Sequence, residues 1–169
     1  MKKIVQRNSK ILRKIAKEIS LVDIGSLKTK KILGEMSHSL RSQNDGVAIA
    51  APQIGYSLRI FVVSGKVFTK DTDKKNKKDL VFINPKISKL SREKEWLPEG
   101  CLSVRWLYGV VHRAKKATIV AYDERGKKFQ RGASGLLAQI FQHEVDHLNG
   151  ILFIDHAKNL REELPKQDK

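Results

Sequence analysis

The chain has 169 residues, of which 40% are hydrophobic and 31% are charged, and it carries a formal net charge of +16. This length and composition exclude wholesale disorder and predict one domain, residues 1–169, with its own core. We expect so basic a surface to favour polyanions such as ribosomal RNA, and the alternative is that it only keeps the protein solvated.

The sequence favours the cytoplasm. No apolar run is long enough to span a bilayer, and the first residues turn polar too soon for a signal peptide. The one cysteine, Cys101, cannot form an internal disulfide, which fits a reducing compartment. We therefore expect neither a membrane nor DNA as a partner, and we expect Cys101 to be a free thiol or a ligand.

The first part of the chain predicts one helix. Residues 1–25 are expected to pack on the body of the protein through four apolar positions, Ile11, Leu12, Ile15 and Ile19. The helix covers residues 26–43 and is broken by Asn44-Asp45-Gly46. Its spacing predicts a buried face made of Ile32, Leu33, Met36 and Leu40.

Residues 46–55, GVAIAAPQIG, are small, apolar and nearly uncharged. They are too few for a helix between Asp45 and Pro52. Small side chains let another backbone approach closely, either a substrate peptide or a neighbouring strand, and the alternative is a packed core loop. Gln53 is the only side chain in this stretch with polar chemistry.

Short strands are predicted in the middle of the chain. They cover residues 58–63 and 79–83, the second ending before a proline, and a charged surface loop begins between them at Lys66. A bend is expected at residues 98–100, and a hairpin is expected over 118–130. The connections are too short for crossover helices, so we expect mostly antiparallel sheets.

Residues 134–150 predict a second amphipathic helix, with Ser134 as its N-cap and Asn149-Gly150 as its end. Its apolar positions recur at helical spacing and are Leu136, Leu137, Ile140, Phe141, Val145 and Leu148. The expected fold is therefore α+β, with antiparallel sheets around this C-terminal helix and with the earlier helix near the N-terminus.

This helix contains His143, Glu144 and His147 in the pattern HExxH. Residues four apart lie one turn above each other, so both imidazoles leave the helix on its buried side. Two histidines with a carboxylate beside them suit a divalent metal whose bound water needs a base. The alternatives are a chance match and histidines that are only hydrogen-bonded in the core.

A catalytic metal needs a third protein ligand. Two protease patterns fail to supply it. One has a histidine as third ligand at the position that Phe153 occupies here. The other has a glutamate well downstream, where this chain offers only Glu162 and Glu163. Cys101 is the natural alternative, since a thiolate is a strong ligand. The competing role for an unpaired cysteine is that of a small buried hydrophobe.

Three segments in this order, GVAIAAPQIG, EGCLS and QHEVDHLNG, resemble the signature motifs of the peptide deformylases, and the similarity extends over roughly residues 8–155. The resemblance implies a metal-dependent hydrolase that removes the N-formyl group from the formyl-methionine of nascent polypeptides and releases formate. Nascent formyl-Met peptides are then the expected partners, and the ribosome is a further one through the basic surface.

The resemblance also implies a role for each matching residue. Cys101, His143 and His147 match the metal ligands, and ferrous iron is the expected ion, with Zn²⁺, Ni²⁺ or Co²⁺ as substitutes. Glu144 matches the general acid/base. Gln53 and the backbone N–H of Leu102 match the groups that stabilise the oxyanion, and Gly46, Val47 and Ala48 match the strand along which the peptide lies. Asp146 is expected to orient the site rather than bind the metal.

Three positions depart from the family pattern. Ala48 stands where glycine is usual, Arg105 where proline commonly follows the second motif, and Gln139 where an apolar pocket residue is often found. Two rival functions stay open on the sequence alone. One is hydrolysis of other acylamides, and the other is a basic ribosome- or RNA-binding module with an inactive fold.

Overall fold

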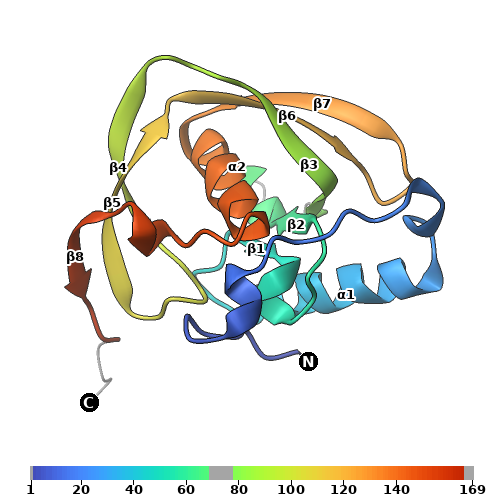
Figure 1. Cartoon of the computed structure of the whole chain (residues 1–169), viewed down its shortest axis with the longest axis horizontal. Helices are drawn as coiled ribbons and strands as arrows, with labels where there is room; N and C mark the ends of the chain where they lie inside the picture. Colours follow the sequence, from blue (N-terminus) through green and yellow to red (C-terminus); the bar gives the residue numbers. More distant parts are fainter. Residues whose placement is uncertain (1, 69–77, 166–169) are drawn as a thin grey trace.

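The computed structural model of the chain describes residues 2–68 and 78–165 (Figure 1). Its two α-helices are α1 (Leu27–Arg41) and α2 (Gly135–Leu148). A five-stranded sheet has the order β1 (Ala48–Ala50), β2 (Ile60–Val63), β3 (Leu80–Leu90), β6 (Lys116–Tyr122) and β7 (Lys128–Ser134). A three-stranded sheet has the order β4 (Lys94–Gly100), β5 (Leu107–Ala114) and β8 (Lys158–Glu162).

All pairings between these strands are antiparallel, as the short connections predict. Five short 3₁₀ turns link the described elements: η1 (Lys10–Arg13), η2 (Leu21–Asp23), η3 (Ala51–Ile54), η4 (Gly65–Phe68) and η5 (Phe153–Asp155). The α+β fold expected from the sequence is confirmed. Neither α-helix is long and apolar enough to cross a membrane.

Helix α2 lies in the interior, between the two sheets (Figure 1). Strand β2 divides the core, because its alternate side chains face opposite sides of the sheet. Phe61 and Val63 pack in the cluster that includes the apolar face of α2, whereas Ile60 and Val62 pack in the cluster that includes the face of α1. All four are fully buried, so both helices are fixed against one sheet.

Helix α1 forms where the sequence predicts it. Ser26 caps its N-terminus, since the Ser26 hydroxyl accepts a hydrogen bond from the Thr29 N–H at 3.2 Å. Its four predicted apolar positions are all buried, and the chain leaves the helix before Asn44. In the N-terminal segment, Leu12 and Ile19 are buried as expected. The prediction that Ile15 packs on the body of the protein is wrong, because this residue is 74% exposed.

Two strand boundaries differ from the prediction. Strand β3 does not end before Pro85 but continues to Leu90, with a register shift between Ile83 and Lys86. A bulge leaves a residue unpaired, so the missing N–H of proline costs no ladder hydrogen bond there. The predicted bend at residues 98–100 is also wrong, since they pair with β5 as the end of β4. Pro98 is tolerated because β4 is an edge strand.

The remaining expectations have different outcomes. The hairpin is present as β6 and β7, and most of the charged loop after Lys66 lies outside the described residues. The segment that carries Glu162, expected as a charged tail, instead pairs with β5 as strand β8. Ser134 is the N-cap of α2 by position, but its side chain makes no capping hydrogen bond, and Leu136 is 52% exposed.

Candidate active site and metal centre

The structure brings Cys101, His143 and His147 together. The two histidines project from one face of α2, and Cys101 directly follows β4 in a turn closed by a Val104 N–H bond to the Cys101 carbonyl at 3.0 Å. The potential ligand atoms of the three residues all lie within 4.8 Å of one another, and Cys101 Sγ is 3.2 Å from His147 Nε2. Such a set of one sulfur and two nitrogens could bind a metal ion.

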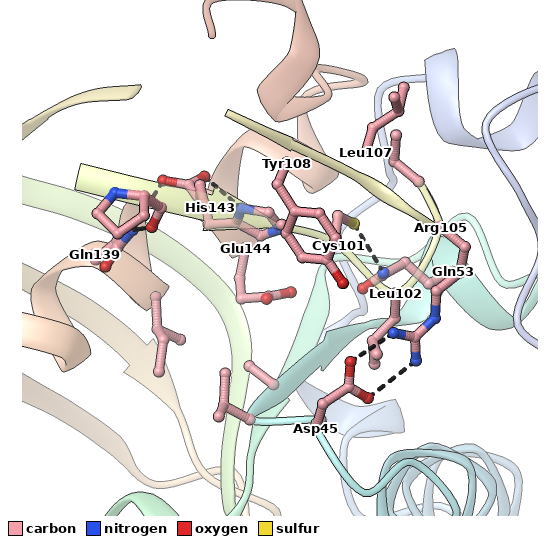
Figure 2. Close-up of a pocket in the computed structure, with 18 of the residues that line it drawn as sticks. Asp45, Gln53, Cys101, Leu102, Arg105, Leu107, Tyr108, Gln139, His143 and Glu144 are labelled. Atoms are coloured by element: carbon pink, nitrogen blue, oxygen red, sulfur yellow. Dashed lines mark hydrogen bonds and ion pairs between the residues drawn. The ribbon is translucent and has the colours of Figure 1, made fainter. Parts of the chain in front are cut away.

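Donors surround the sulfur of Cys101. The backbone N–H of Ser103 lies 3.4 Å from Sγ, and the Gln53 amide nitrogen lies 3.6 Å away (Figure 2). Hydrogen bonds to a ligand atom orient it toward a metal in the way that outer-shell partners do in metal sites. The surroundings of Cys101 therefore suit a ligand better than a small buried hydrophobe.

His143 is oriented by Glu99. Its Nδ1 lies 2.6 Å from Glu99 Oε1, which leaves Nε2 to face the cluster. Burial alone would raise the pKa of Glu99, but hydrogen bonds from His143 and Arg113 lower it to about 2. An ionised carboxylate behind a histidine fixes the ring and raises its strength as a ligand. Glu99 is a site residue that was not predicted from the sequence, although it belongs to the EGCLS motif.

Arg113 connects this carboxylate to the far end of α2. Its Nε and Nη2 bond the Glu99 carboxylate at 3.0 and 2.7 Å, and its Nη1 bonds Asp146 Oδ2 at 2.7 Å. Asp146 is therefore linked to His143 only through Arg113 and Glu99, and it is not one of the three converging groups. Arg113 stands in a strand without any motif, and its register partner in β4 is Glu95 rather than Glu99, so neither a motif nor the strand pairing points to this contact.

The two histidines differ in protonation. Burial lowers the pKa of His147 well below its ordinary value, so its imidazole is neutral, as a ligand must be. Burial also disfavours the charge on His143, but the hydrogen bonds with Cys101 and Glu99 outweigh it and raise the pKa of His143 well above its ordinary value. A metal that binds there would displace a proton.

Glu144 is buried next to the cluster and has no described partner for one oxygen. Among the described residues, Glu144 Oε2 and His147 Nδ1 are the buried side-chain polar atoms without a hydrogen bond. Burial raises the pKa of Glu144 to about 7, so it can both accept and donate a proton near neutral pH. An orphaned oxygen beside three converging ligand atoms fits a metal centre with a water between them.

A cavity of about 370 Å³ opens onto this cluster. Asp45, Gly46, Val47 and Ala48 line one side of it, and the segment from Pro98 to Leu102 lines another. Figure 2 shows Cys101, His143, Glu144, Gln53 and Leu102 around this space. The residues with an expected role line the cavity except His147, which is buried in the core, and Asp146, which was expected only to orient the site.

Gln53 is fixed by its neighbours. Its Oε1 accepts the Ala50 N–H at 2.8 Å, and its Nε2 donates to the Ser103 hydroxyl at 3.1 Å and points to Cys101.

Gln139, which stands where the family often has an apolar residue, makes polar contacts instead. Its Nε2 donates to the Pro98 carbonyl at 2.9 Å and to Glu99 at 3.2 Å. This departure therefore reinforces the carboxylate behind His143 and leaves the cavity open.

Comparison with known proteins agrees with the motifs and the geometry. The family model described as polypeptide deformylase matches residues 1–163. The chain belongs to this family. A peptide deformylase of Pelotomaculum thermopropionicum is 39% identical over 167 residues, which cover 98% of this chain and 97% of the relative.

Solved structures of the family have the same fold. The peptide deformylase of Thermotoga maritima matches with a TM-score of 0.81 and 32% identity, over 94% of this chain and 98% of that one. A class I type b peptide deformylase of Acinetobacter baumannii, solved with Met-Ala-Ser bound, matches with a TM-score of 0.80 and 33% identity, over 91% and 97% of the two chains.

Proposed function

We propose that this chain is the hydrolase that removes the formyl group from the N-terminal formyl-methionine of polypeptides and releases formate. The observation that carries the proposal is the convergence of Cys101, His143 and His147 beside the buried, unpartnered oxygen of Glu144, at the base of an open cavity. The family's activity and the Met-Ala-Ser bound to the Acinetobacter baumannii relative support the same substrate class.

In this proposal Cys101, His143 and His147 hold the metal ion. When bound, the ion would act as a Lewis acid and lower the pKa of the attacking water. Glu99 fixes the His143 ring so that Nε2 would face the ion, and the Ser103 N–H donates to the Cys101 sulfur and helps to hold it in place. The ion implied by the family resemblance is ferrous iron.

Glu144 moves the protons. Its carboxylate takes a proton from the water as the oxygen attacks the formyl carbon, and it then protonates the leaving amine. A pKa of about 7 suits both directions of transfer. We assign Gln53 Nε2 and the Leu102 N–H to the oxyanion, where donors of this kind are each worth about 3–4 kcal/mol.

The peptide would lie along the free edge of β1. This strand is at the edge of its sheet and pairs only with β2 among the described strands. Val47 directs its carbonyl to β2, where it accepts the Ser64 N–H at 2.8 Å. Because alternate residues of a strand direct their N–H and C=O to opposite sides, both backbone groups of Ala48 and the carbonyl of Gly46 are directed away from β2, whereas the Gly46 N–H is donated to the Gln43 carbonyl at 3.2 Å. These groups can hold the backbone of formyl-methionine and of the next residue.

The proposal is tested with protein prepared without oxygen and loaded with iron or nickel. Both forms should release formate from formyl-Met-Ala-Ser, and air should inactivate the iron form faster, because a thiolate and an oxidisable ion share an open site. The measurement is formate release against time in air. No formate from either form would overturn the function, and equal stability in air would overturn iron as the native ion.

We also propose that the enzyme works in the cytoplasm near ribosomes, where its substrate emerges. The support is the net charge of +16, which favours binding to RNA. Co-sedimentation with ribosomes should be strong at low salt and fall steeply toward physiological salt, because each phosphate contact releases counterions. Binding that is absent at low salt, or that does not change with salt, would remove this partner.

We treat residues 1–169 as one catalytic domain, in line with a family match that spans residues 1–163. The rival function, an inactive fold that only binds RNA, is not favoured. A site that had lost its chemistry would have no reason to keep three ligands, an acid/base and the Glu99–Arg113 pair behind them. The choice of formyl-methionine over other acylamides rests on the family.

A further inference from the structure

An ion pair joins two sides of the cavity. Arg105, which follows the turn carrying Cys101, bonds both oxygens of Asp45, which precedes the edge strand, at 2.5 and 3.1 Å (Figure 2). Both residues line the cavity. The family commonly has proline at the position of Arg105, so the pair is a feature of this chain that the proposed chemistry does not use.

The two partners are not equally accessible. The Arg105 side chain is 19% exposed, whereas that of Asp45 is 57% exposed. Arg105 is also held by Gln43 Oε1 at 2.8 Å and lies over the Trp106 ring, 5.0 Å from its centroid. Each Asp45 oxygen can accept a second hydrogen bond. The pair therefore presents a fixed carboxylate to solvent, with its cation turned inward.

The path of the substrate passes this carboxylate. The chain runs from Gly46 through strand β1 to Gln53, whose amide nitrogen is 3.6 Å from Cys101 Sγ. A peptide whose formyl end lies at the metal ligands therefore runs antiparallel to β1 and leaves past Gly46. An extended chain advances about 3.3 Å per residue, so the side chain of the second or third residue comes to Asp45.

Resting on the proposed function, we propose that Asp45, held by Arg105, is a specificity-determining residue that favours a basic second or third residue in the substrate. Hydrogen bonds from Arg105 lower the pKa of Asp45, so the carboxylate is charged at neutral pH. Exposed charge pairs contribute little, so the preference for lysine over glutamate is expected to be about twofold to fivefold.

The test compares kcat/KM for two peptide series, formyl-Met-Xaa-Ser and formyl-Met-Ala-Xaa, in which Xaa is Lys, Ala or Glu. At low salt the wild type should prefer Lys in at least one series, through KM rather than kcat, because the contact is already present in the bound substrate. In Asp45→Asn the preference should vanish or reverse, since the remaining positive surface attracts acidic peptides. Salt should weaken both effects.

Two further variants distinguish a role of Asp45 in substrate preference from a purely structural role of the Asp45–Arg105 ion pair. Arg105→Gln leaves the Asp45 carboxylate without its cation and should raise the preference for Lys, the opposite of Asp45→Asn. Glu18→Gln removes the same charge from an exposed site that does not line the cavity and should change nothing. The inference is overturned if Asp45→Asn keeps the wild-type ratio, or if both cavity variants affect all peptides alike. No turnover of the neutral peptide would overturn the proposed function and this inference with it.

Discussion

Glu144→Ala is expected to lower kcat for formyl-Met-Ala-Ser by at least about a hundredfold while the protein keeps its metal. Glu144 is buried beside the ligands but is not one of the three converging groups, so its loss removes proton transfer and leaves the ligand set complete. The measurement is formate release together with metal content for each purified protein.

Two further substitutions of Glu144 distinguish the length of its side chain from its ability to carry a proton. Glu144→Asp keeps the carboxylate but withdraws it by one methylene, so its kcat should lie between those of wild type and alanine. Glu144→Gln keeps the shape and cannot carry the proton, so it should resemble alanine. As a surface control, Glu162→Ala on the exposed strand β8 should retain wild-type kcat. Glu144→Gln with wild-type kcat would show that another group moves the proton.

Cys101→Ala is expected to fail in a different way, by losing the metal. Removal of one of three ligands should yield metal-poor protein with little activity, and added metal should no longer raise its Tm. In the wild type, metal at a hundred times its Kd should stabilise the fold by about 2.7 kcal/mol. Metal content by elemental analysis and thermal melts with and without added metal measure this.

Glu144→Gln is the matched control for Cys101→Ala, because it should be inactive but metal-loaded, with the same rise in Tm as wild type. The pair of variants therefore distinguishes a failed acid/base from a failed ligand. Should Cys101→Ala retain full metal and activity, the third ligand lies elsewhere and the assignment of the site is wrong. Loss of metal in both variants would instead make Glu144 a ligand.

The positions of His143 and His147 show which structural features the local sequence pattern can predict. A helix repeats every 3.6 residues, so the spacing of His143 and His147 places both on one buried face whatever the rest of the chain does. The same reasoning predicted both helices and the hairpin of β6 and β7, all of which form from residues close in sequence. Strand ends were predicted less well, because the bulge at Asn84-Pro85 and the edge position of Pro98 depend on neighbouring strands.

The supporting residues of the site depend on contacts between distant segments. Glu99 reaches His143 across 44 positions, and Arg113 reaches Asp146 across 33. No periodicity or turn signal connects such residues, because their contact exists only after β4, β5 and α2 have packed together. Their types alone, a glutamate and an arginine in strands, are as common on a solvated surface.

Sequence pattern thus fixed the chemistry that lies within single segments: the paired histidines with Glu144, the small residues of the edge strand, and the lone cysteine after EG. Packing decided the environment of those groups, since burial is what raises the pKa of Glu144 to about 7 and lowers that of His147. It also brought Arg105 to Asp45 across 60 positions. The physical reason is that backbone periodicity acts over a few residues, whereas desolvation and ion pairing depend on which distant segments meet.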